Sequence, residues 1–313
     1  MIYKPDRREQ VLILTFAAVI LASVSAFSMP GRYLSLKVRG LVDDRCTLER
    51  TRLSWAREAR RNELIASGES ITGVVDNGAY KWDTPFGPFW TPISDGAGPL
   101  HTGGFTWGPP ILRWTPIEGS DEPTIRPGDV VMDAGAHSGG STKHALAMGA
   151  SLVIAIEPVA ENLVALRRNL AQEISAGKVI VIQKGVYDRI GDLMFVKRGH
   201  SWDGEFHEPG DGHEGHGDAL PVTTIDAIVA RLNLTRLDFI KMDIEGSEPY
   251  ALAGAKDTLE RFKPRMSVGS YHRVGDLEAI PRIVLAANPT YRMLPSRCLI
   301  WSGRLFPNLL FFY

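Results

Sequence analysis

The sequence predicts an α/β fold with a mostly parallel sheet flanked by helices over residues 126–313. Short β-branched runs alternate there with longer stretches whose apolar residues recur at helical spacing, which is the order expected of parallel strands joined by helices. A glycine-rich loop follows the first of these runs, and an acidic residue ends the second. Ligands of such sheets bind beyond the carboxyl ends of the strands, so both features fall where a site is expected.

Each element follows from its local pattern. Strands are expected where short apolar runs occur, at residues 129–133, 152–157, 178–183, 237–243 and 266–271. Helices are expected at residues 141–148, 158–174 and 248–262. The second of these has a proline near its start and leucines at helical spacing. Further strand-like runs lie at residues 299–301 and 309–313.

Three regions precede this domain. Residues 67–125 are rich in Gly, Pro, Trp and Thr, and prolines at that density disfavour long helices and central strands, so we expect an irregular segment packed on the main domain. Residues 31–66 are expected to form a charged linker helix. Residues 1–30 contain an uncharged run, Val11–Met29, with basic residues on both sides.

The uncharged run just reaches the ~20 residues that a helix needs to cross a bilayer, so we expect a single-pass N-terminal anchor. A cleaved signal peptide is one alternative, because Val24–Ala26 offers small residues for cleavage. A helix buried in the core is the other. The basic residues on both sides leave the orientation open.

Charge and cysteine content exclude several classes of protein. The chain has 35 Lys+Arg and 36 Asp+Glu, a formal charge of −1, which removes the electrostatic case for a nucleic-acid partner. A hydrophobic content of 44% excludes general disorder. Cys46 and Cys298 are too few for a disulfide scaffold and lack metal-type spacing, so both are expected to be buried or indifferent thiols.

The loop after the first strand reads DAGAHSGGS, Asp133–Ser141. It departs from the dinucleotide pattern G-x-G-x-x-G because an acid stands two residues before the first glycine, and a carboxylate suits a cationic amino group better than a pyrophosphate. Glu157 ends the second strand, where an acid commonly binds ribose hydroxyls. A ribose joined to a positively charged, non-phosphate group describes S-adenosylmethionine.

Several stretches resemble the FkbM-type family of S-adenosylmethionine-dependent methyltransferases, which have a Rossmann-like class I methyltransferase domain. They are Pro127–Thr142, Ala155–Leu170, Val222–Val229, Asp238–Ala255 and Ser270–Pro281. The resemblance runs from Arg126 to the C-terminus. It implies S-adenosyl-L-methionine as cofactor, bound at the strand ends.

The resemblance also implies which residues bind the cofactor. The methionine part would be framed by Asp133, Gly135, Ala136, His137 and Gly139, with His137 where related methyltransferases often carry a second glycine. The ribose would be held by Glu157, the adenine bordered by Val186 and Tyr187, and the donor methyl placed next to Asp243. Asn162 is expected either to contact the cofactor or to lie on the helix surface.

Asp243, Glu245 and His272 are the candidate catalytic residues. A hydroxyl acceptor must lose a proton, and the ordinary pKa of histidine suits a base at neutral pH. A hydrogen-bonded core histidine is the alternative for His272. For the two acids, the alternatives are acceptor orientation by Asp243, a shared divalent cation, or a structural turn in which Glu245 accepts loop amides. No metal site is assigned.

A histidine-rich tract lies between the third and fourth strands. His200, His207, His213 and His216 stand there among glycines and acids, and we expect a mobile loop rather than a metal site. Asn233–Thr235 is a glycosylation sequon, which has meaning only in a secretory compartment.

The sequence thus predicts a membrane-anchored methyltransferase that acts on an oxygen of a small-molecule, sugar or lipid-linked acceptor. Its catalytic domain is expected to be cytoplasmic, because the cofactor is made in the cytosol. A non-catalytic binding module with the same fold is one alternative. A nicotinamide-dependent oxidoreductase is the other, although it would need a diphosphate-binding loop that the sequence lacks. The oligomeric state is not predicted.

Overall fold

A computed structural model of the chain describes residues 29–49, 51–52, 73–76, 78–84, 87–95, 123–201, 203–208, 210, 217–296, 298–301 and 304–313. It divides into two compact units, Met1–Ala56 with Arg297–Asn308 and Arg57–Ser296 with Leu309–Tyr313, and each is considered by itself. The expected anchor lies outside the described residues except for Met29. Among the residues that are described, no helix has the length and apolar character needed to span a bilayer.

The smaller unit combines a helix with a hairpin. Helix α2 spans Met29–Val38, and β14 (Cys298–Trp301) pairs antiparallel with β15 (Arg304–Pro307). The linker helix predicted over residues 31–66 is interrupted at residues 39–47, because Gly40 ends α2 in a left-handed conformation, φ +68°. Residues 53–66 lie outside the described part of the chain.

The two cysteines are not thiols, so that expectation is wrong. Cys46 and Cys298 form a disulfide across a sequence separation of 252 residues. Both are buried with Tyr33 and Leu305 in the core of the smaller unit. The small number of cysteines argued against a disulfide. The fold brings the two cysteine-bearing segments together, because the backbone N–H of Asp43 donates a hydrogen bond to the carbonyl of Leu305.

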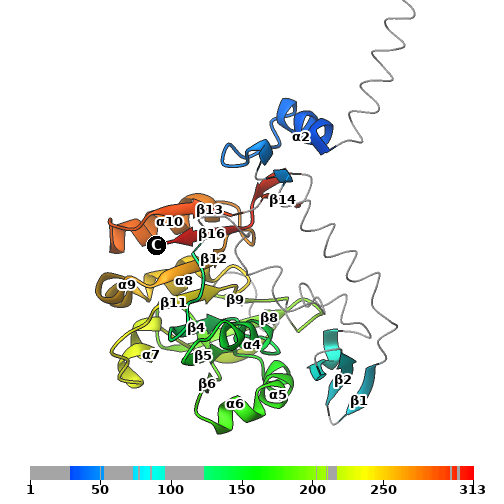
Figure 1. Cartoon of the computed structure of the whole chain (residues 1–313), viewed down its shortest axis with the longest axis vertical. Coiled ribbons are helices and arrows are strands. Elements are labelled where there is room, and N and C mark those ends of the chain that lie inside the picture. The colour runs from blue at the N-terminus through cyan, green and yellow to red at the C-terminus, as the bar shows by residue number, and fades with distance from the viewer. Residues whose placement is uncertain are drawn as a thin grey trace, which may run out of the picture. The chain divides into compact units, whose positions relative to one another are not determined.

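The larger unit is built on a seven-stranded sheet with the order β13-β16-β12-β11-β4-β5-β6 (Figure 1). Strands β12, β11, β4, β5 and β6 are parallel, and β16 and β13 are antiparallel at one edge. The strands are β4 Val130–Ala134, β5 Leu152–Ile156, β6 Val179–Ile182, β11 Phe239–Met242, β12 Arg265–Gly269, β13 Met293–Pro295 and β16 Leu309–Phe312. The predicted α/β fold with a mostly parallel sheet is confirmed.

Helices cover both faces of this sheet (Figure 1). They are α4 Gly140–Ala147, α5 Ala160–Asn169, α6 Ala171–Ser175, α7 Ile225–Arg231, α8 Glu248–Ala253, α9 Lys256–Phe262 and α10 Asp276–Ala287. Because side chains alternate along a strand, Met132 and Ile240 pack with α7–α10, while Val131 and Val153 pack with α4 and α5. The helices predicted over residues 158–174 and 248–262 are each split into two.

The described residues between 73 and 95 form regular elements, which corrects the expectation for that part of the segment. Strands β1 (Gly73–Asp76), β2 (Ala79–Thr84) and β3 (Gly87–Pro92) form an antiparallel sheet, followed by the 3-10 helix η1, Ile93–Asp95. The prolines are tolerated because β3 is an edge strand. Residues 96–122 lie outside the described part.

Two side chains of α5 hold β3 and η1 on this helix. Asn169 accepts a hydrogen bond from the backbone N–H of Trp90 (2.8 Å) and donates one to its carbonyl (2.7 Å). Glu161 accepts bonds from the N–H and hydroxyl of Ser94 (2.8 and 2.9 Å). Strand β3 and the 3-10 helix η1 are thereby held on α5 within the larger unit.

A second, four-stranded sheet has the order β7-β10-β8-β9. Its strands are β7 Gly185–Val186, β8 Gly191–Lys197, β9 Gly204–His207 and β10 Asp218–Thr223. Part of the histidine-rich tract is therefore a strand, with His207 buried in β9. His213 and His216 lie outside the described residues, so metal binding by the tract stays untested.

The disulfide predicts a defined thiol count. The purified chain, denatured without reductant, should give no free thiols in a dithionitrobenzoate assay and two after reduction. Cys46→Ser should give one free thiol and, since native disulfides contribute about 2–5 kcal/mol in small domains, a lower unfolding midpoint in urea. Two free thiols in the unreduced chain would contradict the disulfide.

Candidate active site

The loop after β4 passes very close to the end of β11. A Cβ atom on Gly135 would lie 2.0 Å from the carbonyl oxygen of Asp243, and Gly135 has φ +78°. His137 also adopts a left-handed conformation, φ +49°, which is why a glycine would suit that position. Gly139 follows with φ +89° and precedes α4. The predicted loop thus exists, and Gly135 is required by its tight approach.

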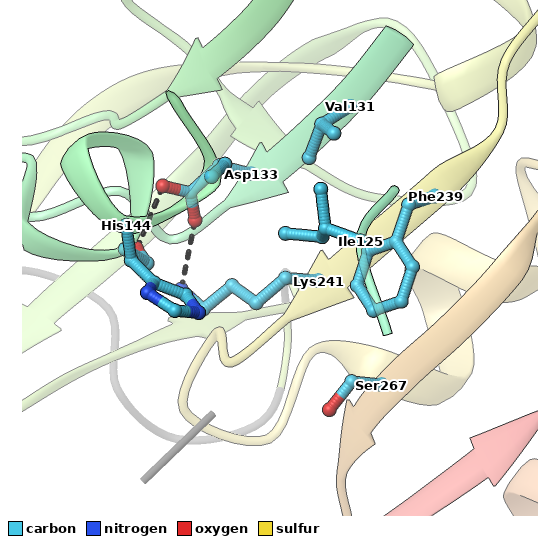
Figure 2. Close-up of a pocket in the computed structure, with 9 residues that line it drawn as sticks. Ile125, Val131, Asp133, His144, Phe239, Lys241 and Ser267 are labelled. Atoms are coloured by element: carbon cyan, nitrogen blue, oxygen red, sulfur yellow. Dashed lines mark hydrogen bonds and ion pairs between the residues drawn. The ribbon is translucent and has the colours of Figure 1, made fainter. Parts of the chain in front are cut away.

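Asp133 is buried and bound on both oxygens (Figure 2). Its Oδ2 accepts hydrogen bonds from the hydroxyls of Ser141 (2.7 Å) and Thr142 (2.6 Å), and its Oδ1 lies 3.0 Å from Lys241 Nζ. Lys241 Nζ also donates to the carbonyl of Gly135 (2.6 Å). Asp133 therefore ties the glycine loop to α4 and β11, and its contact with a cofactor amino group stays a prediction.

Lys241 was not among the predicted site residues. The signal for it was a single lysine in the otherwise apolar run of β11, FIKM, because a fully buried ammonium needs a partner. A small cavity beside it lies on the α4 side of the sheet (Figure 2). Its lining includes Val131 and Phe239, early in their strands, together with Asp133, Ser141 and Lys241 from the network that holds the glycine loop.

Glu157 lies directly after β5 and is buried. Its Oε2 accepts the backbone N–H of His137 (2.9 Å), and its Oε1 accepts the N–H of Val159 (2.9 Å) and the amide of Asn162 (3.0 Å). Burial raises the pKa of Glu157, and these partners oppose that effect. Asn162 is itself 2% exposed, so its expected alternative position on the helix surface is wrong.

Two further residues contact this loop, Asp95 from η1 and Ser201 from the segment after β8. His137 Nε2 lies 3.2 Å from Asp95 Oδ2 and 2.8 Å from Ser201 Oγ. Ser201 donates both its N–H and its hydroxyl to Asp95 Oδ1 (3.1 and 2.5 Å). Burial alone would raise the pKa of Asp95, but His137 and Ser201 lower it below its ordinary value. No local pattern in the sequence marks either residue.

A tight turn follows β11. Glu245 and Gly246 have φ +54° and +95°, and Glu248 at the start of α8 accepts the N–H groups of Ile244 and Gly246, both at 2.9 Å. In the structural turn considered from the sequence, Glu245 was the residue expected to accept the loop amides. The structure gives it to Glu248, which is fully buried, and leaves the side chain of Glu245 beside His272.

His272 lies among three carboxylates, which together with it form the acid–histidine cluster: Asp243, Glu245, Glu248 and His272. Its Nδ1 is 2.9 Å from Glu248 Oε1, and its Nε2 is 3.5 Å from Asp243 Oδ1 and 3.4 Å from Glu245 Oε2. Burial lowers the pKa of a histidine, but the charges of these acids outweigh it and hold the pKa of His272 well above its ordinary value. The three predicted catalytic residues are thus in one place.

The raised pKa changes the expected role of His272. A raised pKa favours the protonated ring, which cannot accept a proton, so the argument from an ordinary histidine pKa does not hold for His272. Burial raises the pKa of Glu245, and the neighbouring His272 lowers it in part. Tyr271 donates its hydroxyl to Asp243 Oδ1 (3.0 Å), which fixes that carboxylate.

Aromatic and charged side chains lie next to the turn. Tyr187 stacks on Tyr250 with ring centroids 4.5 Å apart, and the Arg273 guanidinium lies 5.4 Å from the Tyr250 centroid. Arg273 also pairs with Glu205. Val186 and Tyr187 are buried, and the structure does not test their expected position beside an adenine.

A mostly parallel seven-stranded sheet with a glycine loop after β4 and an acid after β5 defines a Rossmann-like domain of the methyltransferase type. Residues 133–289, just over half of the chain, match the family described as the Methyltransferase FkbM domain. The chain belongs to the FkbM methyltransferase family.

Solved structures of three proteins illustrate what part of this chain is similar to. An FkbM methyltransferase from Methylobacillus flagellatus KT is 26% identical, with 59% of this chain and 44% of that protein covered and a TM-score of 0.45. Precorrin-6y C5,15-methyltransferase from Geobacter metallireducens GS-15 is 14% identical. The match covers 60% of this chain and 79% of that protein, with a TM-score of 0.34. A Streptococcus mutans protein in complex with SAH is 14% identical, with 60% and 89% covered and a TM-score of 0.36.

The matched region spans less than half of the length of the Methylobacillus protein. No curated protein matches this chain.

The approach of Gly135 to Asp243 predicts a large effect of one methyl group. Gly135→Ala should lower the free energy of unfolding by about 1–3 kcal/mol more than Gly177→Ala, because overpacking adds to backbone strain. Gly177 is the matched control, since it has φ +71° but no atom within 4 Å of the point where a Cβ would lie. Urea unfolding followed by circular dichroism measures both. Equal losses would show that backbone strain, not close approach, requires Gly135.

Proposed function

We propose that the chain transfers a methyl group from S-adenosyl-L-methionine to a hydroxyl of a small-molecule, sugar or lipid-linked acceptor. The observation that carries the proposal is the position of the acid–histidine cluster directly after β11, whose end is in contact with the glycine loop at Gly135. Membership of the FkbM family supports the reaction class. A donor held by the loop would then face acidic groups at the next strand end.

The buried groups around Glu157 fit the ribose of this cofactor. Asn162 Oδ1 is buried and has no hydrogen-bond donor within the described part of the chain. Glu157 accepts three hydrogen bonds, while a carboxylate has about four acceptor positions. Both residues therefore have acceptor capacity for the donors that ribose hydroxyls supply. Asp133 and Lys241 would hold the loop rather than the ligand.

The acid–histidine cluster would remove the proton of the acceptor hydroxyl. When bound, S-adenosyl-L-methionine supplies a methyl group activated by its sulfonium. Alignment of the acceptor oxygen with the methyl group can provide much of the rate enhancement. Removal of the hydroxyl proton can provide a further part. Because the surrounding acids raise the pKa of His272 and so disfavour its neutral form, Asp243 and Glu245 are the groups that would accept the hydroxyl proton.

The acceptor wall would be formed by the side chains beside the turn. Tyr250 offers an aromatic face and a hydroxyl, and Arg273 offers a cation held by Glu205. Such a surface suits a polar, hydroxyl-bearing acceptor better than a purely apolar one. The formal net charge of −1 gives no support for a nucleic-acid acceptor.

Location remains a proposal as well. Membrane attachment through residues 11–29 rests on the sequence alone. The cytoplasmic location expected from cofactor supply disagrees with the Cys46–Cys298 disulfide, because cytosolic reductants keep most thiols reduced. An oxidising compartment accounts better for the disulfide, and the exposed sequon at Asn233 is compatible with it.

Cofactor binding is the first test. Isothermal titration of the full chain with S-adenosyl-L-methionine should show one site, and Glu157→Gln should weaken it at least tenfold, since hydrogen bonds to charged groups contribute about 1.5–3 kcal/mol. Glu173→Gln, on α6, is the control and should bind as the parent does. Absence of binding by the folded parent would favour the non-catalytic module, and binding of NADH instead would favour an oxidoreductase.

Methyl transfer is the second test. The chain should transfer tritium from methyl-labelled S-adenosyl-L-methionine to an aqueous or lipid fraction of a cell extract. Asp243→Asn should lower this transfer about 100-fold, because positioned proton-transfer groups contribute roughly 10²–10⁴-fold. Its cofactor affinity should stay within about threefold of the parent value. Undiminished transfer by Asp243→Asn would remove that residue from the mechanism.

A further inference from the structure

We propose that Asp243, Glu245 and His272 bind one divalent cation, with Glu248 orienting the histidine. Binding of the cation is independent of the proposed methyl transfer, whereas its catalytic use rests on that function. The metal-binding atoms of the three residues all lie within 4.8 Å of one another. The set consists of two carboxylates and one imidazole, which are ligands for Mn²⁺ and related divalent metals.

The distances suit ligands that share an ion. His272 Nε2 lies 3.5 Å from Asp243 Oδ1 and 3.4 Å from Glu245 Oε2, at or beyond the upper end of the range for hydrogen bonds. Two ligand atoms that are each about 2.1 Å from one ion, at angles of 90–110°, lie roughly 3.0–3.5 Å apart. The two pairs that include His272 Nε2 therefore already have the spacing of ligand atoms that share an ion.

His272 is a buried group aimed at this position. Its side chain is 7% exposed, and neither ring nitrogen has a hydrogen bond of acceptable geometry to any described residue. Its Nδ1 faces Glu248 Oε1 at 2.9 Å, so that Nε2 points at the other two acids. A histidine that binds metal through one nitrogen usually has a carboxylate or carbonyl beside its other nitrogen, and Glu248 lies beside Nδ1 here.

Glu248 is itself held rigidly. Each of its oxygens accepts a backbone N–H, from Ile244 and from Gly246. The turn that supplies Glu245 is thus fixed by the same carboxylate that orients His272. Gly269, at the end of β12, also borders the cluster. A Cβ at this position would lie 3.1 Å from Asp243 Oδ1 and 3.3 Å from His272 Cε1, so the glycine leaves room for both side chains.

The charges also favour a cation. Three carboxylates face one imidazole, and their side chains are at most 29% exposed. Buried carboxylates need positive partners, and Arg273, the adjacent cationic residue, is paired with Glu205. A divalent ion bound to the neutral imidazole, in place of the ring proton, would offset the negative charge of these carboxylates.

The ion would have a direct use in the proposed reaction. Coordination of the acceptor hydroxyl lowers its pKa, as a metal does for bound water. The hydroxyl proton then passes to water, the acceptor oxygen forms its bond to the methyl carbon, and the carbon–sulfur bond breaks to leave the neutral thioether. No oxidant or reductant is needed. The carboxylates would serve as ligands rather than as bases.

The test is Mn²⁺ binding by the full chain after treatment with a chelator and desalting. Loss of the electron paramagnetic resonance signal of free Mn²⁺ should show one bound ion per chain. Glu245→Gln and His272→Ala should each weaken binding at least tenfold, and Glu248→Gln should do so about tenfold, as outer-shell changes do. Controls are Glu173→Gln and His200→Ala, which lie outside the cluster and should bind Mn²⁺ as the parent does.

Thermal unfolding of each variant shows whether it is folded, and Glu245→Gln, in the more exposed side chain, keeps the test valid if His272→Ala does not fold. Absence of saturable Mn²⁺ binding, or equal binding by the parent and Glu245→Gln, would overturn the site. Titration of the same samples with S-adenosyl-L-methionine separates the two proposals. Cofactor binding without Mn²⁺ binding overturns only the metal site, and Mn²⁺ binding without cofactor binding overturns only the methyltransferase function.

Discussion

The close packing of the glycine loop against the end of β11 is the constraint on which the site depends. Parallel pairing places Asp133 opposite Lys241, so β4 and β11 end at the same level. Gly135 then passes the carbonyl of Asp243 without a side chain in the way, and the Lys241 ammonium binds the carbonyl oxygen of Gly135. A loop that holds a donor and a turn that meets an acceptor are thereby fixed relative to each other, as in-line transfer requires.

Local patterns sufficed for the fold of the central sheet and for the position of its glycine loop. Buried parallel strands are short apolar runs, and the loop had to follow the first of them, so both were predictable from neighbours in sequence. Asp95 and Ser201 were not, because they meet His137 from segments 42 and 64 residues away. The Cys46–Cys298 pair, 252 residues apart, depends on a fold that no count of cysteines reveals.

The backbone conformation of the turn after β11 determines which glutamate accepts its amides, and the composition of the turn does not. The DIEGSE stretch offers two glutamates, and the sequence does not say which one accepts the loop amides. The left-handed conformation of Glu245 turns the chain so that Glu248 reaches the N–H groups of the turn. Strained residues of this kind persist where the surroundings determine them strongly, and they concentrate at functional sites.

The same turn links the cluster to the proposed acceptor wall. A Cβ on Gly246 would lie 2.7 Å from Arg273 Nε, so the guanidinium packs directly on the turn that Glu248 stabilises. His272 and Arg273 are consecutive, and one contacts the cluster while the other contacts Tyr250 and Glu205. A shift of this segment would therefore move the charged cluster and the acceptor wall together. The buried Glu248 carboxylate then contributes more than charge, because it holds the turn between the two halves of the site.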